Sequence, residues 1–461
     1  MKKEEIETII NYALDKGIEY AELFFENKNS FGMVLSKNKV DNCNSNRLNG
    51  VGIRLFKDNL ITYSSTSVLT EENLKKIIDQ ISSVYKKEKG NKKVKLKNLK
   101  IAPKKKDIIY LENHSKNQIK NLLIEINCKA KKLDPRIKNI EVYFGYTIRH
   151  ITIANSDGNY VNEERIRSSI YVNLVMEEKD NKTYGDEFKY LLGGLEILKN
   201  FNIDQFLNSA LKKGQKKLKA VNIPGGKMPV ILANGTGATL FHEAVGHSLE
   251  AYAVARGIST FDGLLNKKIA SDVVTLIDDG SKKGLSGTTY FDDEGNKTKK
   301  NILIENGILK SYLVDIIDGG KINQLSTGSA RRESYTWAPN ARMNNTYLAK
   351  GNSKIKDMIK SIDYGMYVYE LNGGQVKIDL GEFTFGVSLA RLIENGKLTK
   401  YVKDITLIGK CNEILHKVEM VSNDLKFVGT GLCGSASGNI PVSEGQPTIK
   451  ITEILVGGKE D

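Results

Sequence analysis

The sequence predicts an α+β fold in two domains, a helix-and-strand N-terminal half and a β-rich C-terminal half that carries a histidine-containing helix. Three observations support this prediction. The chain has 461 residues, too many for one ordinary core. Helical and strand periodicities alternate in the first half, whereas strand patterns dominate after Val273. Turn-forming residues from Asn222 to Lys227 separate the halves, so we expect domains at 1–222 and 223–461.

The first half begins with a predicted helix over Lys3 to Lys16, where apolar residues recur at helical spacing before Gly17. Similar patterns predict helices over the ranges 73–85, 107–132 and 195–220. Strands are expected over the ranges 20–26, 32–36, 50–57, 139–155 and 159–178. The last two strands are joined by Ser156-Asp157-Gly158, a sequence typical of a hairpin turn.

The second half opens with a short buried strand over Met228 to Ala233, and a glycine turn leads from it into a helix over Ala238 to Tyr252. Strands follow over the ranges 273–278, 289–291, 301–304, 308–316, 374–379, 383–387 and 401–408. The pentapeptide Leu-Ile-Glu-Asn-Gly occurs at 303–307 and again at 392–396. Because Asn-Gly after an apolar run favours a tight turn, we interpret both copies as hairpins.

The composition is that of an ordinary globular protein, with 40% hydrophobic and 27% charged residues. The first seven positions carry acidic residues in place of the apolar run of a signal peptide, and no stretch approaches the length of a membrane span. A cytoplasmic protein is therefore expected. The four cysteines are too scattered for a disulfide framework, and at least one is a candidate metal ligand or nucleophile: Cys43, Cys128, Cys411 and Cys433.

The formal net charge of +14 raises the question of an anionic partner such as nucleic acid or a membrane surface. Only 11 of the 69 basic residues are arginine, the residue that base and phosphate recognition favours. The densest basic run, Lys86 to Lys106, contains few aromatic or arginine residues and is interpreted as a solvated linker or helix face. No specific nucleic-acid or membrane partner is expected.

The segment from Phe241 to Glu250 carries the residues of a zinc hydrolase. It holds two of the five histidines, His242 and His247, with Glu243 directly after the first. Neutral imidazoles bind zinc, and an adjacent carboxylate can accept a proton from water that the zinc has made acidic.

The spacing of the two histidines is unusual, because they are five residues apart rather than four. On an ideal helix at about 100° per residue, a separation of five leaves side chains roughly 140° apart, against roughly 40° for four. If both histidines share one metal, the helix must contain a π-bulge or end near Gly246. The alternative is two core or surface histidines with no metal. Cys433, in a glycine-rich tail, is likewise either a metal ligand or a small buried residue in a turn.

Ten short stretches, in a fixed order along the chain, together resemble a known protein family. They are Ala21-Glu22-Leu23-Phe24, Gly50-Val51-Gly52-Ile53-Arg54, His242-Glu243-Ala244-Val245-Gly246-His247, Asp292-Asp293-Glu294-Gly295, Leu303-Ile304-Glu305-Asn306-Gly307, Arg331-Arg332-Glu333-Ser334-Tyr335, Gly373-Gly374-Gln375-Val376, Cys433-Gly434, Gly445-Gln446-Pro447-Thr448 and Val456-Gly457-Gly458. In this order they resemble the TldD/PmbA family of cytoplasmic metallopeptidases. The histidine helix and the C-terminal cysteine together resemble the TldD-type, zinc-carrying subunit.

The resemblance implies that His242, His247 and Cys433 bind Zn2+ and that Glu243 is the general base and acid of peptide hydrolysis. Two histidines and one cysteine leave a fourth tetrahedral position for water, as a catalytic zinc site requires. Glu243 would take the proton of that water and later return it to the departing amine. Glu250 is expected either to orient a ligand or to be an exposed acid.

The resemblance also implies a dimer, with a PmbA-type subunit or with a second copy, that admits unfolded or short peptides. Substrate would then add as a strand at an exposed edge near Gly373-Gly374-Gln375-Val376. Four further residues either clamp substrate or stabilise the oxyanion, or else form structural ion pairs: Arg331, Arg332, Glu333 and Tyr335. The remaining histidines and cysteines lie in no metal-type spacing and are interpreted as structural: His114, His150, His416, Cys43, Cys128 and Cys411.

Two competing functions remain open from the sequence. One is a non-catalytic, zinc-stabilised scaffold or nucleic-acid-associated regulatory protein, whose DNA affinity would depend steeply on salt. The other is a zinc amidohydrolase of small molecules, because the same metal and base can act on any amide.

Overall fold

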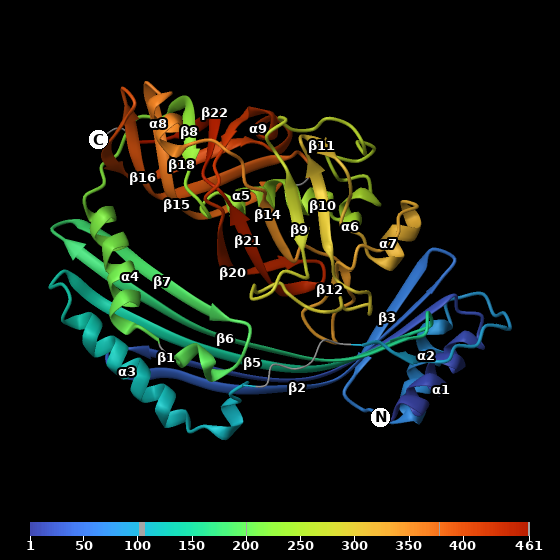
Figure 1. Cartoon of the computed structure of the whole chain (residues 1–461). Helices are drawn as coiled ribbons and strands as arrows, with labels where there is room; N and C mark the ends of the chain where they lie inside the picture. Colours follow the sequence, from blue (N-terminus) through green and yellow to red (C-terminus); the bar gives the residue numbers. More distant parts are fainter. Residues whose placement is uncertain (101–106, 200, 378, 460–461) are drawn as a thin grey trace.

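The computed structural model describes residues 1–100, 107–199, 201–377 and 379–459. The last six residues of the lysine-rich run lie outside this range. The part described is a strand-rich mixture of helices and sheets, so the predicted α+β class is confirmed. Two large assemblies are visible, a long curved sheet from the first half of the chain and a compact group of sheets above its concave side (Figure 1).

The long sheet contains seven strands, most of them much longer than the average strand. Its order is β3-β2-β1-β5-β6-β4, and β7 pairs with β6. The strands are β1 (Tyr20–Ser36), β2 (Lys39–Lys57), β3 (Leu60–Thr66), β4 (Lys97–Asn98), β5 (Ile137–Asn155), β6 (Asn159–Glu178) and β7 (Asn181–Leu191).

Helices cover the long sheet at its two ends (Figure 1). At one end lie α1 (Lys3–Leu14) and α2 (Glu71–Ser82), whose apolar faces share a core with residues of β1 and β2. At the other end lie η1 (Leu111–Asn113), α3 (Lys116–Lys131), η2 (Leu195–Leu198) and α4 (Ile203–Leu218), which share a second core with β1, β5 and β6. The helical spacing of apolar residues in the sequence explains these packed faces.

The second assembly contains two principal sheets. The first has the order β15-β8-β22-β18-β16-β17 and closes on itself through a pairing of β15 with β16, while β19 pairs with β22. Its elements are β8 (Gly226–Leu232), β15 (Tyr364–Lys377), β16 (Glu382–Glu394), β17 (Lys397–Val402), β18 (Ile405–Lys410), β19 (Val418–Val421), β22 (Ile449–Gly457), α8 (Ile355–Lys360) and α9 (Cys411–Lys417).

The other principal sheet has the order β11-β10-β9-β14-β21-β20, and a separate pair joins β12 and β13. The elements are β9 (Leu276–Asp279), β10 (Lys300–Glu305), β11 (Ile308–Leu309), β12 (Ala330–Arg331), β13 (Asn340–Ala341), β14 (Asn345–Leu348), β20 (Lys426–Ser435), β21 (Gly438–Gln446) and α7 (Ile316–Lys321). One large apolar core lies between the two principal sheets and includes the segment that carries the histidines.

Several local predictions are confirmed. Both Leu-Ile-Glu-Asn-Gly copies form two-residue hairpin turns, between β10 and β11 and between β16 and β17. The turn residues have the positive φ that such turns require, 47° and 81° at Asn306 and Gly307 and 50° and 70° at Asn395 and Gly396. The Ser156-Asp157-Gly158 hairpin is also present.

Other predictions of strand extent are wrong. The strands expected over 20–26 and 32–36 form one continuous strand, β1, because it pairs with β2 and β5 along almost its whole length. The segment 401–408 is divided between β17 and β18, and 289–291 forms no strand. The division at residue 222 stays a prediction, although the long sheet ends with β7 and the remaining sheets begin with β8.

A network of buried charges joins the long sheet to the second assembly. Arg54 Nη2 lies 2.7 Å from Glu22 Oε2 and 2.6 Å from Glu294 Oε1. Arg332 donates to Glu22 Oε1 and, through its backbone N–H, to Asp293 Oδ2 at 2.8 Å. All five side chains are buried. The network therefore brings together four of the stretches on which the family resemblance depends.

No helix in the described part of the chain is long and apolar enough to span a membrane.

Candidate metal centre

The segment with the two histidines is a distorted helix, as their spacing predicts. It follows β8 and begins as α5 (Ala238–Phe241), widens into the π-helical turn η3 (His242–Gly246) and ends as the 3-10 turn η4 (His247–Leu249). The backbone N–H of His247 donates to the carbonyl of His242, the five-residue hydrogen bond of a π-turn. The helix expected over 238–252 is divided into these short segments and α6 (Ala251–Val254), and the bulge expected near Gly246 is confirmed.

A close approach requires glycine within this bulge. A Cβ atom at Gly246 would lie 2.0 Å from Sδ of the buried Met343. After η4 the chain is extended at Glu250, and α6 (Ala251–Val254) follows. The distortion brings the rings of His242 and His247 to a centroid distance of 5.3 Å with perpendicular planes.

Cys433 completes the cluster from a distant part of the sequence. Its Sγ lies 3.2 Å from Nε2 of His242 and 3.2 Å from Nε2 of His247. The candidate ligand atoms of these three buried residues all lie within 4.8 Å of one another. Tetrahedral zinc, with bonds of about 2.0 Å to nitrogen and 2.3 Å to sulfur, places its ligand atoms roughly 3.3–3.6 Å apart. Two imidazole nitrogens and one sulfur at these distances fit a zinc ion.

A bulge in β20 positions the cysteine. The antiparallel register between β20 and β21 shifts between Gly429 and Leu432, and Cys433 then lies opposite Ile440. Bulges of this kind redirect side chains, often beside functional sites. Leu432 is 70% exposed whereas Cys433 is 4% exposed, so the strand directs the sulfur inward. The alternative of a cysteine in a turn is wrong, because Cys433 lies in a strand.

A carboxylate and a guanidinium connect two members of the cluster. Glu250 Oε2 lies 3.1 Å from Nδ1 of His247, and Glu250 is buried, so the alternative of an exposed acid is wrong. Its other oxygen, Oε1, lies 3.7 Å from Nε of Arg342. Arg342 Nη2 donates to Cys433 Sγ at 3.1 Å and to the Cys433 carbonyl at 2.6 Å. Glu250 and Arg342 therefore fix the positions of His247 and Cys433 relative to each other.

The other histidine faces a second carboxylate. Nδ1 of His242 lies 3.6 Å from Oε1 of Glu444, and Thr239 donates to Oε2 of Glu444 at 2.6 Å. Burial raises the pKa of Glu444 to about 7, against the opposing effect of the Thr239 hydrogen bond. Burial also lowers the pKa of His242 well below its usual value, and the positive charges of His247 and Arg342 act in the same direction. A neutral His242 has the form that binds metals.

Glu243 is the carboxylate on the open side of the cluster. Its side chain is 35% exposed, and its Oε2 lies 3.6 Å from Nε2 of His247, the same nitrogen that faces Cys433. A base in this position can reach a water molecule beside the cluster and still exchange protons with solvent.

The remaining candidate residues have structural contacts. Within the described residues, His242, His247 and Cys433 form the single group of three or more potential metal ligands. Arg331 is buried and donates to the carbonyls of Met343 and Pro441. Arg332 belongs to the buried charge network, the Glu333 carboxylate accepts from Asn439 N–H, and the Tyr335 N–H donates to Glu26. Of these four residues, Arg332 forms a structural ion pair, with Glu22, and the contacts of the other three described above are hydrogen bonds that involve backbone groups. A role in substrate binding stays a prediction.

Two residues of the site were missed from the sequence, Glu444 and Arg342. Each is a single polar residue in a segment without a recognisable motif. Glu444 reaches the cluster through the pairing of β21, and Arg342 through the position of the segment that follows β13. The stretch Gly445-Gln446-Pro447-Thr448 lies next to Glu444 and was the nearest sequence signal.

Comparison with protein families gives matches along most of the chain. Residues 225–458 match the PmbA/TldA metallopeptidase C-terminal domain, residues 109–218 the central domain and residues 21–84 domain 1 of the same group. The C-terminal match alone includes the histidine segment and Cys433.

Two relatives are similar over nearly their whole length. A metalloprotease TldD homologue of Buchnera aphidicola subsp. Acyrthosiphon pisum is 33% identical over 96% of this chain and 93% of its own. A zinc metalloprotease TldD homologue of Saccharolobus solfataricus is 28% identical over 89% of this chain and 90% of its own.

A solved structure shows the same fold. It is that of a Thermotoga maritima protein described as a modulator of a DNA gyrase, with a TM-score of 0.80, 19% identity, and coverage of 99% of this chain and 100% of that chain. The prediction of an enzyme of the metallopeptidase class is confirmed by the family matches and the relatives. From these matches, the chain belongs to the PmbA/TldD family of metallopeptidases.

Proposed function

We propose that this protein is a zinc metallopeptidase in which His242, His247 and Cys433 bind Zn2+ and Glu243 is the general base. One observation carries the proposal: two imidazole nitrogens lie 3.2 Å from the same thiol sulfur, with the Glu243 carboxylate beside them. Three protein ligands leave one tetrahedral position for water or substrate, which distinguishes a catalytic zinc site from a closed structural one.

The residues around the cluster have separate parts in this chemistry. Zinc, when bound, supplies a Lewis acid and lowers the pKa of water toward neutrality. Glu243 accepts the proton of the attacking water and returns it to the departing amine. Glu250 fixes the orientation of His247 by accepting from its Nδ1, and Arg342 holds the sulfur of Cys433 by donating to it.

The proposed substrates are unfolded or short peptides that bind in extended form at an open strand edge. Residues 374–377 of β15 pair with β16 on one side, and no described strand pairs with them on the other. The edge expected near Gly373-Gly374-Gln375-Val376 is therefore open. A second open edge is β20, the terminal strand of its sheet, which carries Cys433 itself. Main-chain pairing at such edges does not depend on side-chain sequence, which suits a peptidase of broad specificity.

The proposal also includes an oligomeric state and a cellular location. We infer that the protein works in the cytoplasm as a dimer, either with a PmbA-type subunit or with a second copy. Neither a specific nucleic acid nor a membrane is needed for the chemistry of the cluster.

The proposal is tested by bound zinc and peptide cleavage measured on the same preparations. We compare wild type, Glu243→Gln, Cys433→Ser and Cys411→Ser, assayed with an unstructured peptide, with and without a PmbA-type partner. Glu243→Gln should keep zinc and lose cleavage, Cys433→Ser should lose zinc, and Cys411→Ser, a buried cysteine outside the cluster, should keep both.

Three results would contradict the proposal. Full zinc occupancy in Cys433→Ser would remove the cysteine from the ligand set. Zinc binding without cleavage of any peptide would favour the zinc-stabilised scaffold, and cleavage confined to small amides would favour an amidohydrolase.

A further inference from the structure

The concave face of the long sheet carries a row of basic residues. Lys28 of β1 pairs with Arg149 of β5, and Arg149 pairs with Arg165 of β6. Arg167 lies two residues beyond Arg165 on the same strand, and residues two apart on a strand lie on the same face of the sheet. Arg165 Nη1 lies 2.6 Å from Asp293 Oδ1, so this is the face toward the second assembly (Figure 1). The four basic side chains therefore belong to the face that the second assembly covers.

The four basic residues differ in their partners. Arg149 and Arg165 form buried ion pairs with carboxylates. Arg167 instead donates from Nε and Nη2 to one backbone carbonyl, that of Ser286, at 3.3 and 3.2 Å. Within the described residues, neither Lys28 nor Arg167 forms an ion pair. Both side chains are partly exposed, so an anion from outside the chain can reach them.

Two carboxylates act on Lys28 from a longer distance, and both have other donors. Glu26 accepts from Nε of Arg149 at 2.6 Å, and Glu333 accepts from the N–H of Asn439 at 2.7 Å. Burial lowers the pKa of Lys28, with Arg149 acting in the same direction and the two carboxylates against it. The ammonium group of Lys28 is therefore available to a further carboxylate.

Another buried guanidinium, that of Arg331, lies beside Arg167. Arg331 donates to two backbone carbonyls. Burial lowers the pKa of Arg331 to about 9, and the positive charge of Arg167 acts in the same direction, against the opposing effect of Asp293. Burial also lowers the pKa of Arg167. A bound anion stabilises such a concentration of positive charge.

Two buried hydroxyl groups lie beside Arg167, those of Ser286 and Tyr190. Ser286 is completely buried, and within the described residues neither Ser286 Oγ nor Tyr190 Oη makes a hydrogen bond of ordinary geometry. Burial raises the pKa of Tyr190, and the nearby Arg167 and Ser286 oppose this effect, so the phenol lies close to both. Buried hydroxyl groups normally form hydrogen bonds, and these two can donate to a bound anion.

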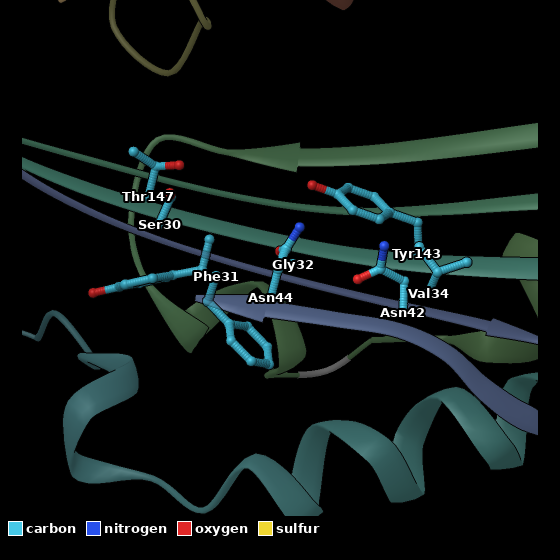
Figure 2. A pocket seen from close by; sticks show the side chains of 9 residues that line it. Ser30, Phe31, Gly32, Val34, Asn42, Asn44, Tyr143 and Thr147 are labelled. Carbon is cyan, nitrogen blue, oxygen red and sulfur yellow. The ribbon is translucent and has the colours of Figure 1, made fainter. Parts of the chain in front are cut away.

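A hollow in the long sheet lies next to these groups. It has a volume of about 190 Å3, and its lining includes Ser30 and Thr147. Thr147 pairs with Ser30 on one side and with Arg167 on the other, so the three residues lie in one row across the sheet. Figure 2 shows Thr147 and Tyr143 directed to one side of the sheet and Phe31 to the other. A ligand in this hollow can therefore reach the guanidinium of Arg167.

The basic residues lie close to the candidate metal centre. Arg331 Nη2 donates to the carbonyl of Pro441 at 2.6 Å, and Pro441 is next in β21 to the residue that pairs with Cys433. The N–H of Ser286 donates to Oγ of Ser443, three residues from the partner of Cys433. Three or four residues of extended chain cover about 10–13 Å. An extended peptide whose scissile bond lies at the cluster can therefore place a group near Ser286 with three or four residues.

We propose that Lys28 and Arg167, together with the hydroxyl groups of Tyr190 and Ser286, bind a carboxylate of the peptide substrate three or four residues from the scissile bond. The carboxylate belongs either to the C-terminus or to an aspartate or glutamate side chain. The inference rests on the proposed function and narrows its substrate class to peptides with a negative charge at a set distance from the cleaved bond. Main-chain pairing at a strand edge leaves the other positions free of sequence preference.

Peptide binding to the Glu243→Gln protein tests the proposal without hydrolysis. The probes are fluorescently labelled nonapeptides with blocked ends, in which a single glutamate, or a glutamine in its place, is moved along the sequence. A further pair without glutamate ends in a free acid or an amide, which separates a terminal carboxylate from a side-chain one. Cleavage by wild type locates the scissile bond in each peptide, and fluorescence anisotropy measures the Kd. We expect a carboxylate at the stated distance to bind at least about tenfold tighter than its neutral counterpart, because charge-assisted hydrogen bonds are the stronger ones.

Variants of the basic residues assign this preference to the site. Adding Lys28→Gln or Arg167→Gln should remove most of the preference, whereas Arg167→Lys, which keeps the charge, should retain most of it. Lys189→Gln is the matched control. It removes a positive charge next to Tyr190 on β7, but Lys189 Nζ lies 5.0 Å from the ring centroid of Phe201, which packs against the core on the other face of the sheet. Zinc content and circular dichroism verify the fold of each variant.

Three results would overturn the proposal. They are equal binding of every charged and neutral pair, a preference that survives both Lys28→Gln and Arg167→Gln, and a preference that Lys189→Gln reduces as strongly as Arg167→Gln does. Failure of the proposed function gives a different result, since wild type would then cleave none of the peptides while the charge preference in binding stayed intact.

Discussion

Nδ1 of His247 lies 3.1 Å from Oε2 of Glu250, and this contact directs the opposite ring nitrogen toward Cys433. Carboxylates that orient a metal-binding imidazole typically contribute 10–100-fold to metal affinity. We therefore expect Glu250→Gln, which keeps size but removes charge, to lower zinc affinity by about 10–100-fold. Competition with a fluorescent chelator measures this.

The matched control is Glu243→Gln, since Glu243 does not contact Nδ1 of His247. It should lower zinc affinity much less than Glu250→Gln does. Equal affinities in wild type and Glu250→Gln would show that the carboxylate is not needed to orient the ring.

The packing of Met343 against Gly246 predicts a steric requirement at the π-turn. An added methyl group at Gly246 would displace the buried Met343 side chain, next in sequence to Arg342. Gly246→Ala is expected to cost about 1–3 kcal/mol of folding stability through overpacking. Denaturant unfolding of wild type, Gly246→Ala, Met343→Ala and the double variant measures the coupling.

In the Met343→Ala background the space is already free, so adding Gly246→Ala should cost less there than in wild type. If the losses in unfolding free energy of the two single variants add exactly, the clash between the added methyl group and Met343 is relieved by other parts of the structure at no cost in stability.

The buried charge network predicts a large stability loss when one partner is removed. Arg332→Met removes the guanidinium that donates to the Glu22 carboxylate and to the Asp293 carbonyl in a buried site, whereas the backbone N–H that donates to Asp293 Oδ2 stays. Breaking one side of a buried ion pair costs about 3–5 kcal/mol, whereas an exposed pair contributes about 1 kcal/mol or less. Lys16→Met, which removes a partly exposed partner of Asp79, is the control. Comparable losses in the two variants would contradict this account of the network.

The contact between Asp134 and Arg136 predicts a pH-dependent contribution to stability. Arg136 donates from Nε and Nη2 to Asp134 and holds the pKa of that carboxyl well below its usual value, which is about 3.9. A lowered folded pKa means that stabilisation is complete above the unfolded pKa and is lost as the pH falls toward the folded one.

The difference in Tm between wild type and Asp134→Asn should therefore be constant above about pH 5 and shrink as the pH falls from about 4 to 2. Thermal unfolding followed by circular dichroism across this range measures it. A difference that persists unchanged to pH 2 would indicate a hydrogen bond that does not depend on the carboxylate charge.

Local patterns predicted much of the fold, and their physical basis explains where they stopped. Asn-Gly at 306–307 and 395–396 requires positive φ, so both turns were predictable from two residues. The joining of the segments 20–26 and 32–36 into one strand, β1, could not be predicted from local patterns. Asn27 to Ser30 are polar, and only pairing with the neighbouring strands β2 and β5 keeps them extended.

The cluster shows the same division between local and tertiary information. The five-residue spacing of His242 and His247 predicted a bulge, because helix geometry is a local property. Their meeting with Cys433 depends on how β20 packs against the histidine segment, and no local pattern encodes it. Family resemblance supplied that link. It did not identify Arg342 or Glu444, which contact the cluster from single positions.

The ion pairs that join Glu22 and Arg54 to Glu294 and Arg332 also restrict how this chain can be recombined. A chimera that takes its first hundred residues from a relative inherits half of the network from each parent. It should fold only if the incoming segment presents a carboxylate and a guanidinium at these two places. The two halves of the protein can therefore vary independently in their loops and surfaces. The charged residues at this junction, however, must come from both halves in compatible pairs.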